Sequence, residues 1–387
     1  MPIPEQRDLD KARGVIRDWL AGKLPGAGDQ TISTLVGPAF TGFSNETLLF
    51  DASWREGGET RSAGYVIRVK PTSHTIFLEA DFDSQYKVIK ALSEYTDVPL
   101  PPVHWYEDDE SVLGAQFFVM GKVEGHVPSD NPPYTQTGWL LEEATPAVRA
   151  RVVDNGLSAL SQIHRTDWRK LGLDFLDKPQ YGSPGIDQQI AYYERSFEWA
   201  AQGRPQPVAE AALDWVKANK PTGAQHLALG WGDARINNQM FDDDGNVVAV
   251  FDWEMVTLAD PMMDLAWWLF LDRHFHEGMP APDDQDDQGE VYGAGPPGMP
   301  RLEGFPTREQ MVARYRELTG WQPHDLEFYE VFAGLRFAVV MMRIAALVVE
   351  FELLPSETGM DRNNIVTRLL AAKLGLPAPG PEPLPAV

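Results

Sequence analysis

Cysteine is absent from the 387-residue sequence, so disulfide bonds and thiolate metal sites are both excluded. The N-terminal segment MPIPEQRDLDKARGVIRDWL has no apolar core of the kind that a secretory signal needs, and we therefore expect a cytoplasmic protein. Long uncharged apolar runs are also absent. The longest apolar stretch, residues 332–354, is interrupted by Arg336, Arg343 and Glu350, which favours a buried helix over a membrane span.

Basic residues are few, with 33 lysines and arginines against 57 aspartates and glutamates, and the formal net charge is −24. So large a negative charge argues against nucleic acids and anionic membranes as partners. It could attract a cationic small molecule, although a generally acidic surface explains the same composition. The length suits two or three domains, and no pattern in the sequence indicates an oligomeric state.

One stretch of the sequence places three polar residues in apolar surroundings: Asp233, Asn238 and Asp252. The residues DDDG at 242–245 form a tight-turn signal. The apolar run 247–251 that follows predicts a buried strand, which ends at Asp252. A hairpin that turns at 242–245 returns Asp252 to the segment that holds Asp233 and Asn238. We therefore expect the three side chains to converge at the open end of this hairpin.

Two carboxylates and a carboxamide in one place suit phosphoryl transfer. Proteins bind Mg²⁺ with a few oxygen ligands that are completed by phosphate oxygens, which predicts Asp252 and Asn238 as metal ligands. A further carboxylate, Asp233, can orient a hydroxyl group and accept its proton as the catalytic base. The spacing D-x-x-x-x-N, followed by an aspartate at a strand end, is the arrangement that kinases use.

Three motifs follow one another here: WGDARINN at 231–238, FDWE at 251–254 and ADPMMDLA at 259–266. They resemble H-G-D-x-x-x-x-N, I-D-W-E and G-D-P-x-x-D-L-A of the aminoglycoside phosphotransferase-like family, and are closest in pattern to the branch fused to acyl-CoA dehydrogenases. The resemblance implies an α+β, protein-kinase-like fold of two lobes. Residues 1–120 would form a small antiparallel β-sheet lobe that binds nucleotide, and residues 121–387 a larger, mainly helical lobe for catalysis and the acceptor.

The N-terminal part of the chain has the order of elements that opens a kinase small lobe. Periodicity predicts a helix over 8–22 and strands over 31–36, 46–54 and 64–70. The residues TGFSNET at 41–47 resemble the family's phosphate loop, G-G-x-S-N-x-T. This resemblance implies that Ser44 and Asn45 lie near the phosphates of ATP, where small residues allow close backbone approach.

The third strand carries two cations on one face, Arg68 and Lys70. Kinases place a cation here against the nucleotide phosphates, which favours Arg68, with Lys70 as the fallback and a solvated strand face as the plain alternative. A glutamate from the next helix, predicted over 76–94, normally holds this cation, but the matching residue is Gln85. We expect the backbone around Met120, where a later strand enters the hinge, to contact adenine.

The C-terminal part is predicted to be mainly helical. Periodicity predicts helices over 148–167, 187–203, 208–218, 307–319 and 324–351. Asp260 is expected to cap one more helix, and Asp264 within it to brace the catalytic loop. Residues 274–305, rich in proline, glycine and aspartate, are either a cover over the acceptor site or a surface insertion.

The resemblance implies an ATP- and Mg²⁺-dependent phosphotransferase whose acceptor is a hydroxyl of a small molecule. That acceptor would be aminoglycoside-like or a metabolic hydroxy compound, such as a hydroxyacyl thioester. Arg235 stands where protein kinases carry a lysine that touches the transferred phosphate, so it either takes that part or anchors the loop. Trp231 replaces the family's usual histidine. Together with Gln85, this departure leaves a second interpretation open, a catalytically weak or silent nucleotide-binding regulator.

Overall fold

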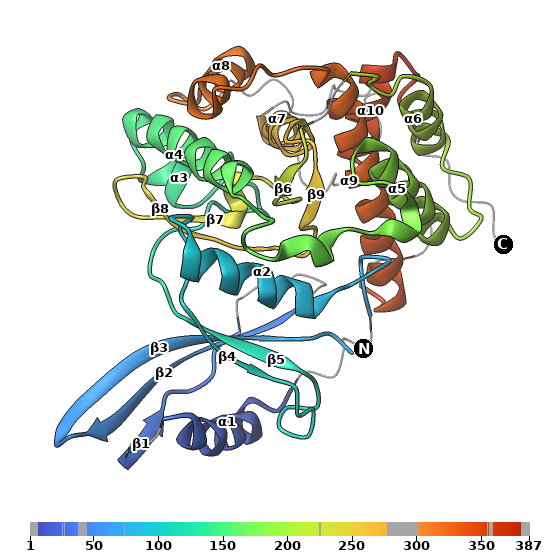
Figure 1. Cartoon of the computed structure of the whole chain (residues 1–387). Coiled ribbons are helices and arrows are strands. Elements are labelled where there is room, and N and C mark those ends of the chain that lie inside the picture. The colour runs from blue at the N-terminus through green and yellow to red at the C-terminus, as the bar shows by residue number, and fades with distance from the viewer. Residues whose placement is uncertain are drawn as a thin grey trace.

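The computed structural model describes residues 7–24, 26, 28–37, 45–72, 74–223, 226–276, 301–353, 355 and 359–380. The largest sheet lies at one end of the molecule and most of the helices lie at the other, which is the two-lobed α+β architecture that the sequence predicts (Figure 1). The lobe boundary at 120/121 remains a proposal. Ser44 and residues 277–300, most of the stretch that breaks the helical pattern, lie outside the described residues.

The small lobe is built on a five-stranded antiparallel sheet in the order β1-β2-β3-β5-β4. The strands are β1 Gly28–Ile32, β2 Glu46–Glu56, β3 Glu59–Val69, β4 Val103–Glu107 and β5 Phe117–Gly121. The prediction of a strand over 31–36 is wrong in extent. β1 ends at Ile32; beyond it, Ser33 donates its backbone N–H to the carbonyl oxygen of Asp51 at 2.8 Å, and Val36 forms an isolated bridge to Leu49.

Two helices cover opposite faces of this sheet (Figure 1). α1, Leu9–Lys23, packs its apolar side against β1, β2, β3 and β5 in a core of its own. α2, Phe82–Tyr95, lies on the face toward the helical lobe and shares that lobe's core. It starts later than the predicted residue 76 because Asp81 caps it, with Oδ1 accepting a 3.0 Å hydrogen bond from the backbone N–H of Ser84.

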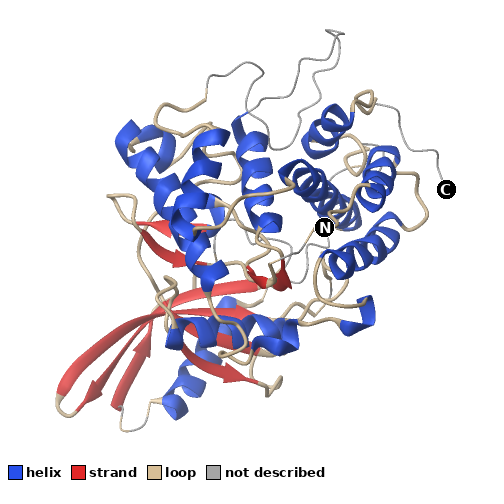
Figure 2. Ribbon diagram, turned by 45° about the horizontal axis from the view of Figure 1, so that its top comes forward, coloured by secondary structure: helices blue, strands red, loops and turns tan. Residues whose placement is uncertain are grey.

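The helical lobe is organised around two helices, α7 and α9. Its helices are α3 Trp139–Glu142, α4 Pro146–Arg165, α5 Ile186–Ala201, α6 Pro207–Ala218, α7 Met262–His276, α8 Arg308–Thr319, α9 Leu326–Glu350 and α10 Ile365–Leu374, and short 3₁₀ turns lie at η1 Leu173–Leu176, η2 Pro179–Tyr181 and η3 Ile236–Asn238. The predicted helices are all present, with ends shifted by a few residues. Figure 2 shows them packed together beyond the strands.

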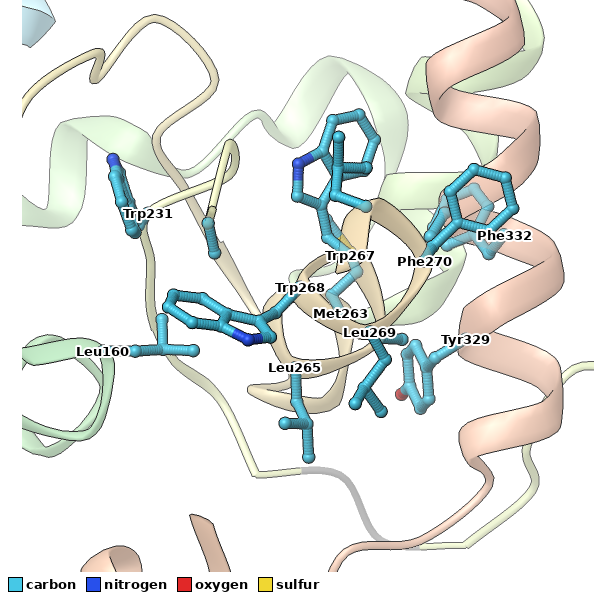
Figure 3. Packing of buried hydrophobic residues seen from close by; sticks show 14 of the residues in the cluster. Leu160, Trp231, Met263, Leu265, Trp267, Trp268, Leu269, Phe270, Tyr329 and Phe332 are labelled. Atoms are coloured by element: carbon cyan, nitrogen blue, oxygen red, sulfur yellow. The ribbon is translucent and has the colours of Figure 1, made fainter. Parts of the chain in front are cut away.

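α7 is buried along its whole length and forms the centre of the helical lobe (Figure 3). Its Phe270 packs beside Phe332 of α9, while Trp268 points toward Leu160 of α4. α9 is long and apolar enough to cross a membrane by length and composition, but 78% of its most apolar window is buried inside the fold. It is therefore the buried core helix that the interrupted apolar run predicts.

One long hairpin carries the loops of the candidate site. Its paired strands are β6 Ala228–Gly230 with β9 Thr257–Ala259, and β7 Gln239–Phe241 with β8 Val247–Val250. The predicted turn at 242–245 is confirmed, since Asp242 and Asn246 close it by a backbone hydrogen bond of 3.0 Å. Loops 231–238 and 251–256 interrupt the two arms at the same level, so they face each other.

Candidate active site

Loop 231–238 is anchored by the buried carboxylate of Asp264, on α7. Oδ2 accepts a hydrogen bond from the backbone N–H of Trp231 at 2.6 Å, and Oδ1 accepts one from the N–H of Gly232 at 3.0 Å. His164 contacts the same carboxylate, with 3.1 Å between Nε2 and Oδ2. These partners replace the water that a buried charge loses. The contacts agree with the bracing role predicted for Asp264.

Gly232 lets this loop approach loop 251–256 closely. Its φ is +94°, and a Cβ at this position would lie 2.1 Å from the carbonyl oxygen of Met255. Only glycine fits both conditions. Arg336 of α9 donates from Nη2 to the carbonyl oxygen of Gly232 at 2.8 Å, and its guanidinium stacks 4.5 Å from the ring centroid of Trp267. The loop backbone is thus fixed by α9 as well as by α7.

The carboxylate of Asp233 is held by three side-chain donors. Oδ2 accepts from Asn238 Nδ2 at 2.6 Å and from Arg235 Nε at 3.2 Å. Oδ1 accepts from the indole Nε1 of Trp267 at 2.7 Å. An ionised carboxylate offers about four acceptor positions. Oδ1, with one donor, therefore retains room for a hydroxyl group of a substrate.

Arg235 bridges two carboxylates. Its Nε contacts Asp233, and its Nη1 donates to Oδ1 of Asp130 at 2.8 Å. Burial lowers the pKa of Arg235, but the charges of Asp130 and Asp233 outweigh it, so the pKa lies above its usual value and the group stays cationic. Asn237 ties down the same segment by donating from Nδ2 to the carbonyl oxygen of Ser129 at 2.9 Å. These contacts are those of a loop anchor, and a contact with phosphate remains a prediction.

Asp252 stands at the start of loop 251–256, directly opposite Asn238. Phe251 donates its backbone N–H to the carbonyl oxygen of Asn238 at 3.0 Å. Asp252 itself adopts a left-handed backbone with φ +63°, a conformation that costs free energy and that aspartate tolerates better than most residues. Trp231 fixes this turn, since its Nε1 lies 3.0 Å from the carbonyl oxygen of Phe251 and 3.2 Å from that of Asp252.

Asn238 and Asp252 present the oxygen atoms that suit a hard cation. Nδ2 of Asn238 is committed to Asp233, which leaves Oδ1 as the end without a hydrogen bond to any described residue. The partly buried carboxylate of Asp252 likewise has no hydrogen bond or ion pair within the described part of the chain. Burial raises the pKa of Asp252, while the positive charge of Arg68 opposes this shift.

The donor set fits Mg²⁺ in the company of phosphates. In the described residues, no group of three or more histidine, aspartate or glutamate side chains is arranged to hold a metal ion by itself. Mg²⁺ is commonly bound by one or two protein oxygens, with phosphate oxygens and water completing the shell. The pair Asn238 and Asp252 therefore fits this metal, provided that a phosphorylated ligand supplies the remaining oxygens.

A second polar cluster adjoins the first and contains Arg68. Its Nη1 donates to Oγ1 of Thr47 at 3.2 Å, and its Nη2 donates to Oε1 of Glu254 at 3.1 Å. Asn45 donates from Nδ2 to the same Oε1 of Glu254 at 2.7 Å and to Oε1 of Gln85 at 3.0 Å. The carboxylate beside the strand cation therefore comes from loop 251–256, where α2 offers only Gln85.

Lys70 and Met120, the remaining residues predicted to contact nucleotide, both contact other residues of the protein. Nζ of Lys70 donates to Oε1 of Gln116 at 2.9 Å, whereas Arg68 contacts Glu254 of the loop that carries Asp252, which favours Arg68 as the cation for phosphate. Met120 pairs with Val66 of β3, and its side chain lies in the core of the helical lobe. The structure thus brings together two groups. They are Asp233, Arg235, Asn238 and Asp252 in one, and Asn45, Arg68 and Gln85 in the other. Their roles toward nucleotide stay predictions.

Three residues of the site are missed by sequence reasoning: Trp267, Asp130 and Glu254. Trp267 stands in an apolar helical run and is indistinguishable from a core residue there. Asp130 precedes Asn131 in an irregular segment, and no motif marks it. Glu254 belongs to the FDWE motif, so its position marks it, but nothing in the sequence indicates that its partner is Arg68.

Comparison with known proteins places this geometry in a family. Residues 42–305 match the model of the phosphotransferase enzyme family. Acyl-CoA dehydrogenase family member 11 of Gallus gallus is 32% identical over 259 residues, which cover 66% of this chain and 30% of that protein. The probable acyl-CoA dehydrogenase IBR3 of Arabidopsis thaliana is 28% identical over 309 residues, or 77% of this chain and 34% of that protein. The chain spans about a third of the length of these relatives.

Solved structures share the fold. A candidate aminoglycoside phosphotransferase from Ralstonia eutropha is 26% identical, with a TM-score of 0.61 over 87% of this chain and 89% of that one. The aminoglycoside phosphotransferase APH(4)-Ia, in a ternary complex with ADP and hygromycin B, is 14% identical, with a TM-score of 0.52 over 92% of this chain and 98% of that one. The protein-kinase-like, two-lobed fold that the sequence predicts is confirmed.

Proposed function

This chain belongs to the phosphotransferase enzyme family, and we propose that it transfers the γ-phosphoryl group of ATP, in the presence of Mg²⁺, to a hydroxyl group of a small molecule. Family membership makes it a small-molecule kinase, while the nucleotide, the metal and the acceptor are our proposal. The proposal rests chiefly on one observation. The hairpin holds Asp233, Asn238 and Asp252 on facing loops, with Asp233 fixed by three donors and Asp252 left without a partner among the described residues.

Each side chain has a definite part in this proposal. Asp233 orients the acceptor hydroxyl at Oδ1 and accepts its proton. Asp252 and Asn238 hold Mg²⁺, which neutralises charge on the phosphate oxygens when it is bound. Arg68 projects from β3 toward the same loops and supplies a second positive charge for the phosphates. Catalysis of this kind depends chiefly on positioning and charge, which suits the many contacts that fix these residues.

Adenine nucleotides are the first to test. The structures of APH(4)-Ia that share this fold include complexes with ADP and with AMP-PNP. Those ligands belong to that protein, and at 14% identity the likeness concerns the fold alone. The case for ATP in this chain comes from its own small lobe, where Arg68 and Asn45 both contact Glu254, two residues beyond the candidate metal ligand Asp252.

Two departures from the family pattern, Trp231 and Gln85, led us to consider a silent regulator, and other contacts compensate for each of them. Trp231, which replaces the usual histidine, donates to two carbonyl oxygens of the turn that carries Asp252. Gln85, which replaces the usual glutamate, leaves Arg68 with a carboxylate all the same, since Glu254 provides one. Both departures from the family pattern are thus accommodated by other contacts.

The acceptor is a hydroxyl compound from one of two classes. Relatives in the same fold are named as aminoglycoside phosphotransferases, and the relatives with the greater identity are named as acyl-CoA dehydrogenases. An acceptor screen should therefore contain aminoglycosides and hydroxyacyl thioesters side by side. The measurement is ADP release from ATP and Mg²⁺, with each acceptor compared with an acceptor-free reaction.

We expect ADP release to rise with at least one acceptor and to require Mg²⁺. An Asp233→Asn variant in the same assay controls for a contaminating kinase. Failure of the wild-type protein to bind ATP with or without Mg²⁺ would overturn the proposal. Binding of ATP without turnover of any acceptor would return the silent regulator to favour.

A further inference from the structure

Glu254 stands in an unusual place for a carboxylate that holds the strand cation. In kinases that residue is a glutamate on the helix of the small lobe, here α2. This chain has Gln85 at the matching position on α2, and the carboxylate reaches Arg68 from loop 251–256 of the other lobe. Glu254 is two residues beyond Asp252, so one short segment holds both the candidate metal ligand and the partner of the cation.

The carboxylate of Glu254 is largely buried and is held by two side-chain donors. Its side chain is only 6% exposed, and Oε1 accepts from Arg68 at 3.1 Å and from Asn45 at 2.7 Å. Hydrogen bonds between charged partners with so little exposure are stronger than those on a surface. Asn45, which directly precedes β2, in turn contacts Gln85, so one cluster of hydrogen bonds joins β3, α2 and loop 251–256.

Removal of this carboxylate has a predictable consequence. The positive charge of Arg68 also acts on Asp252, the carboxylate of the proposed metal pair. Without Glu254, we expect the guanidinium to turn toward Asp252 and pair with it, because a largely desolvated cation is stabilised by a carboxylate. Asp252 would then be occupied by an arginine where a metal ion is needed.

We propose that Glu254 is a positioning residue, which holds Arg68 on the phosphate side of the site and so keeps Asp252 available to Mg²⁺. In this protein it takes the part that a glutamate of α2 takes in other kinases. The inference rests on the proposed function, because it presumes binding of ATP with Mg²⁺. It concerns residues of this chain alone and can be tested by nucleotide binding, without an acceptor.

The readout is the ratio of the Kd for ATP in EDTA to the Kd for ATP in Mg²⁺, both measured by calorimetry; we call this ratio the Mg²⁺ factor. A role limited to stability would change the melting temperature and leave this factor alone. We expect Glu254→Ala to lower the factor about tenfold, the size expected for one charge-assisted hydrogen bond. Glu254→Gln keeps an oxygen acceptor and loses only the charge, so its effect should be smaller.

Moving the carboxylate to α2 gives the decisive variant. Oε1 of Gln85 and Oε1 of Glu254 are both within hydrogen-bond distance of Nδ2 of Asn45, so a glutamate at position 85 would reach the same cluster. We expect Gln85→Glu to recover most of the Mg²⁺ factor in the Glu254→Ala background. A direct metal ligand at position 254 could not be replaced from α2, and neither could a side chain needed only for packing.

Glu330 provides the matched control. Its side chain lies on α9, is 11% exposed, and pairs with Arg308 and Lys373, so Glu330→Gln also weakens ion pairs of a largely buried carboxylate. We expect it to lower the melting temperature and leave the Mg²⁺ factor at the wild-type value. A wild-type factor in Glu254→Ala, or a loss that Gln85→Glu does not restore, would overturn the proposal. If Glu254→Ala does not fold, the same comparison is made in the Glu254→Gln background. Absence of Mg²⁺-dependent ATP binding in the wild-type protein would instead refute the proposed function.

Discussion

The indole N–H of Trp267 points at the carboxylate of Asp233, with 2.7 Å between Nε1 and Oδ1. The two residues are brought together by packing of α7 beneath the loop and not by sequence proximity. Asn238 and Arg235 hold the other oxygen of the same carboxylate. Asp233 is consequently fixed from two sides before any substrate arrives, which is the arrangement expected where a reaction depends on positioning.

Replacement of Asp233 by asparagine should remove the base and keep the site in place. An asparagine fits the same volume but cannot accept the proton of the hydroxyl, so we expect turnover to fall by about 10²–10⁴-fold. Affinity for ATP should stay nearly unchanged, because the phosphates are held elsewhere. The measurement is ADP release with the acceptor that the screen selects. Asp243→Asn, at a hairpin position whose side chain is 94% exposed, is the control and should retain full activity. Wild-type turnover in Asp233→Asn would contradict the role.

Replacement of Trp267 by phenylalanine should separate the hydrogen bond from the packing. The ring is largely kept while the N–H to Asp233 is lost, and we expect turnover to fall about tenfold with little change in ATP affinity. Trp268→Phe is a control on the same helix, since its indole forms no hydrogen bond with any described residue. Equal turnover in the two variants would show that the contact with Asp233 does not matter for the reaction.

Asp252 should make Mg²⁺ binding sensitive to acid. Burial raises the pKa of its carboxyl above the usual value for aspartate, about 3.9. Mg²⁺ binds only the deprotonated form, so a raised pKa means that protons begin to compete at a higher pH than for an exposed aspartate. We expect the factor by which Mg²⁺ tightens ATP binding to decline on acidification, and to begin its decline at a higher pH than an exposed aspartate would give.

The matching variant is Asp252→Ala, in which Mg²⁺ should no longer tighten ATP binding at any pH. Titration of ATP with and without Mg²⁺ in a series of buffers from neutral to acid pH gives both results in one experiment. A factor that is independent of pH in the wild-type protein, or one that persists in Asp252→Ala, would remove Asp252 from the metal site.

Local sequence patterns were enough to predict most of the fold. The helices have regular apolar spacing, and the DDDG turn closes the hairpin, so the return of Asp252 toward Asn238 follows from sequence, although the register shift between Met240 and Phe241 does not. The start of α2 was predicted wrongly because apolar periodicity extends before Phe82, whereas the cap at Asp81 decides where helical hydrogen bonding begins.

Long-range partners could not be predicted in the same way. Arg68 and Glu254 are 186 residues apart, and Arg235 and Asp130 are 105 apart. Each pair forms because separate elements happen to be packed side by side, and no spacing in the sequence encodes that packing. The sequence therefore predicted a weakened cation site from Gln85, and the structure supplies the missing carboxylate from the opposite lobe.

His274 provides a test of the helical core that is independent of catalysis. It is buried on α7 against Phe275 and Phe337, and burial lowers its pKa to about 4. The charge of Asp130 raises this pKa and that of Arg235 lowers it, so burial decides the direction. The folded protein therefore keeps His274 neutral at a pH where the unfolded chain, with a pKa of about 6.5, already takes up a proton.

This difference should make the protein lose stability as the pH falls from about 6.5 to about 4, by up to about 3 kcal/mol from this residue. His274→Phe keeps an aromatic ring and removes the titration, so its melting temperature should fall less steeply over that window. The exposed His226, replaced by glutamine, is the control and should follow the wild-type curve. Thermal unfolding in a series of buffers gives all three curves. If His274→Phe and the wild-type protein have the same slope, His274 is not held neutral by the core, and the acid sensitivity must come from other groups.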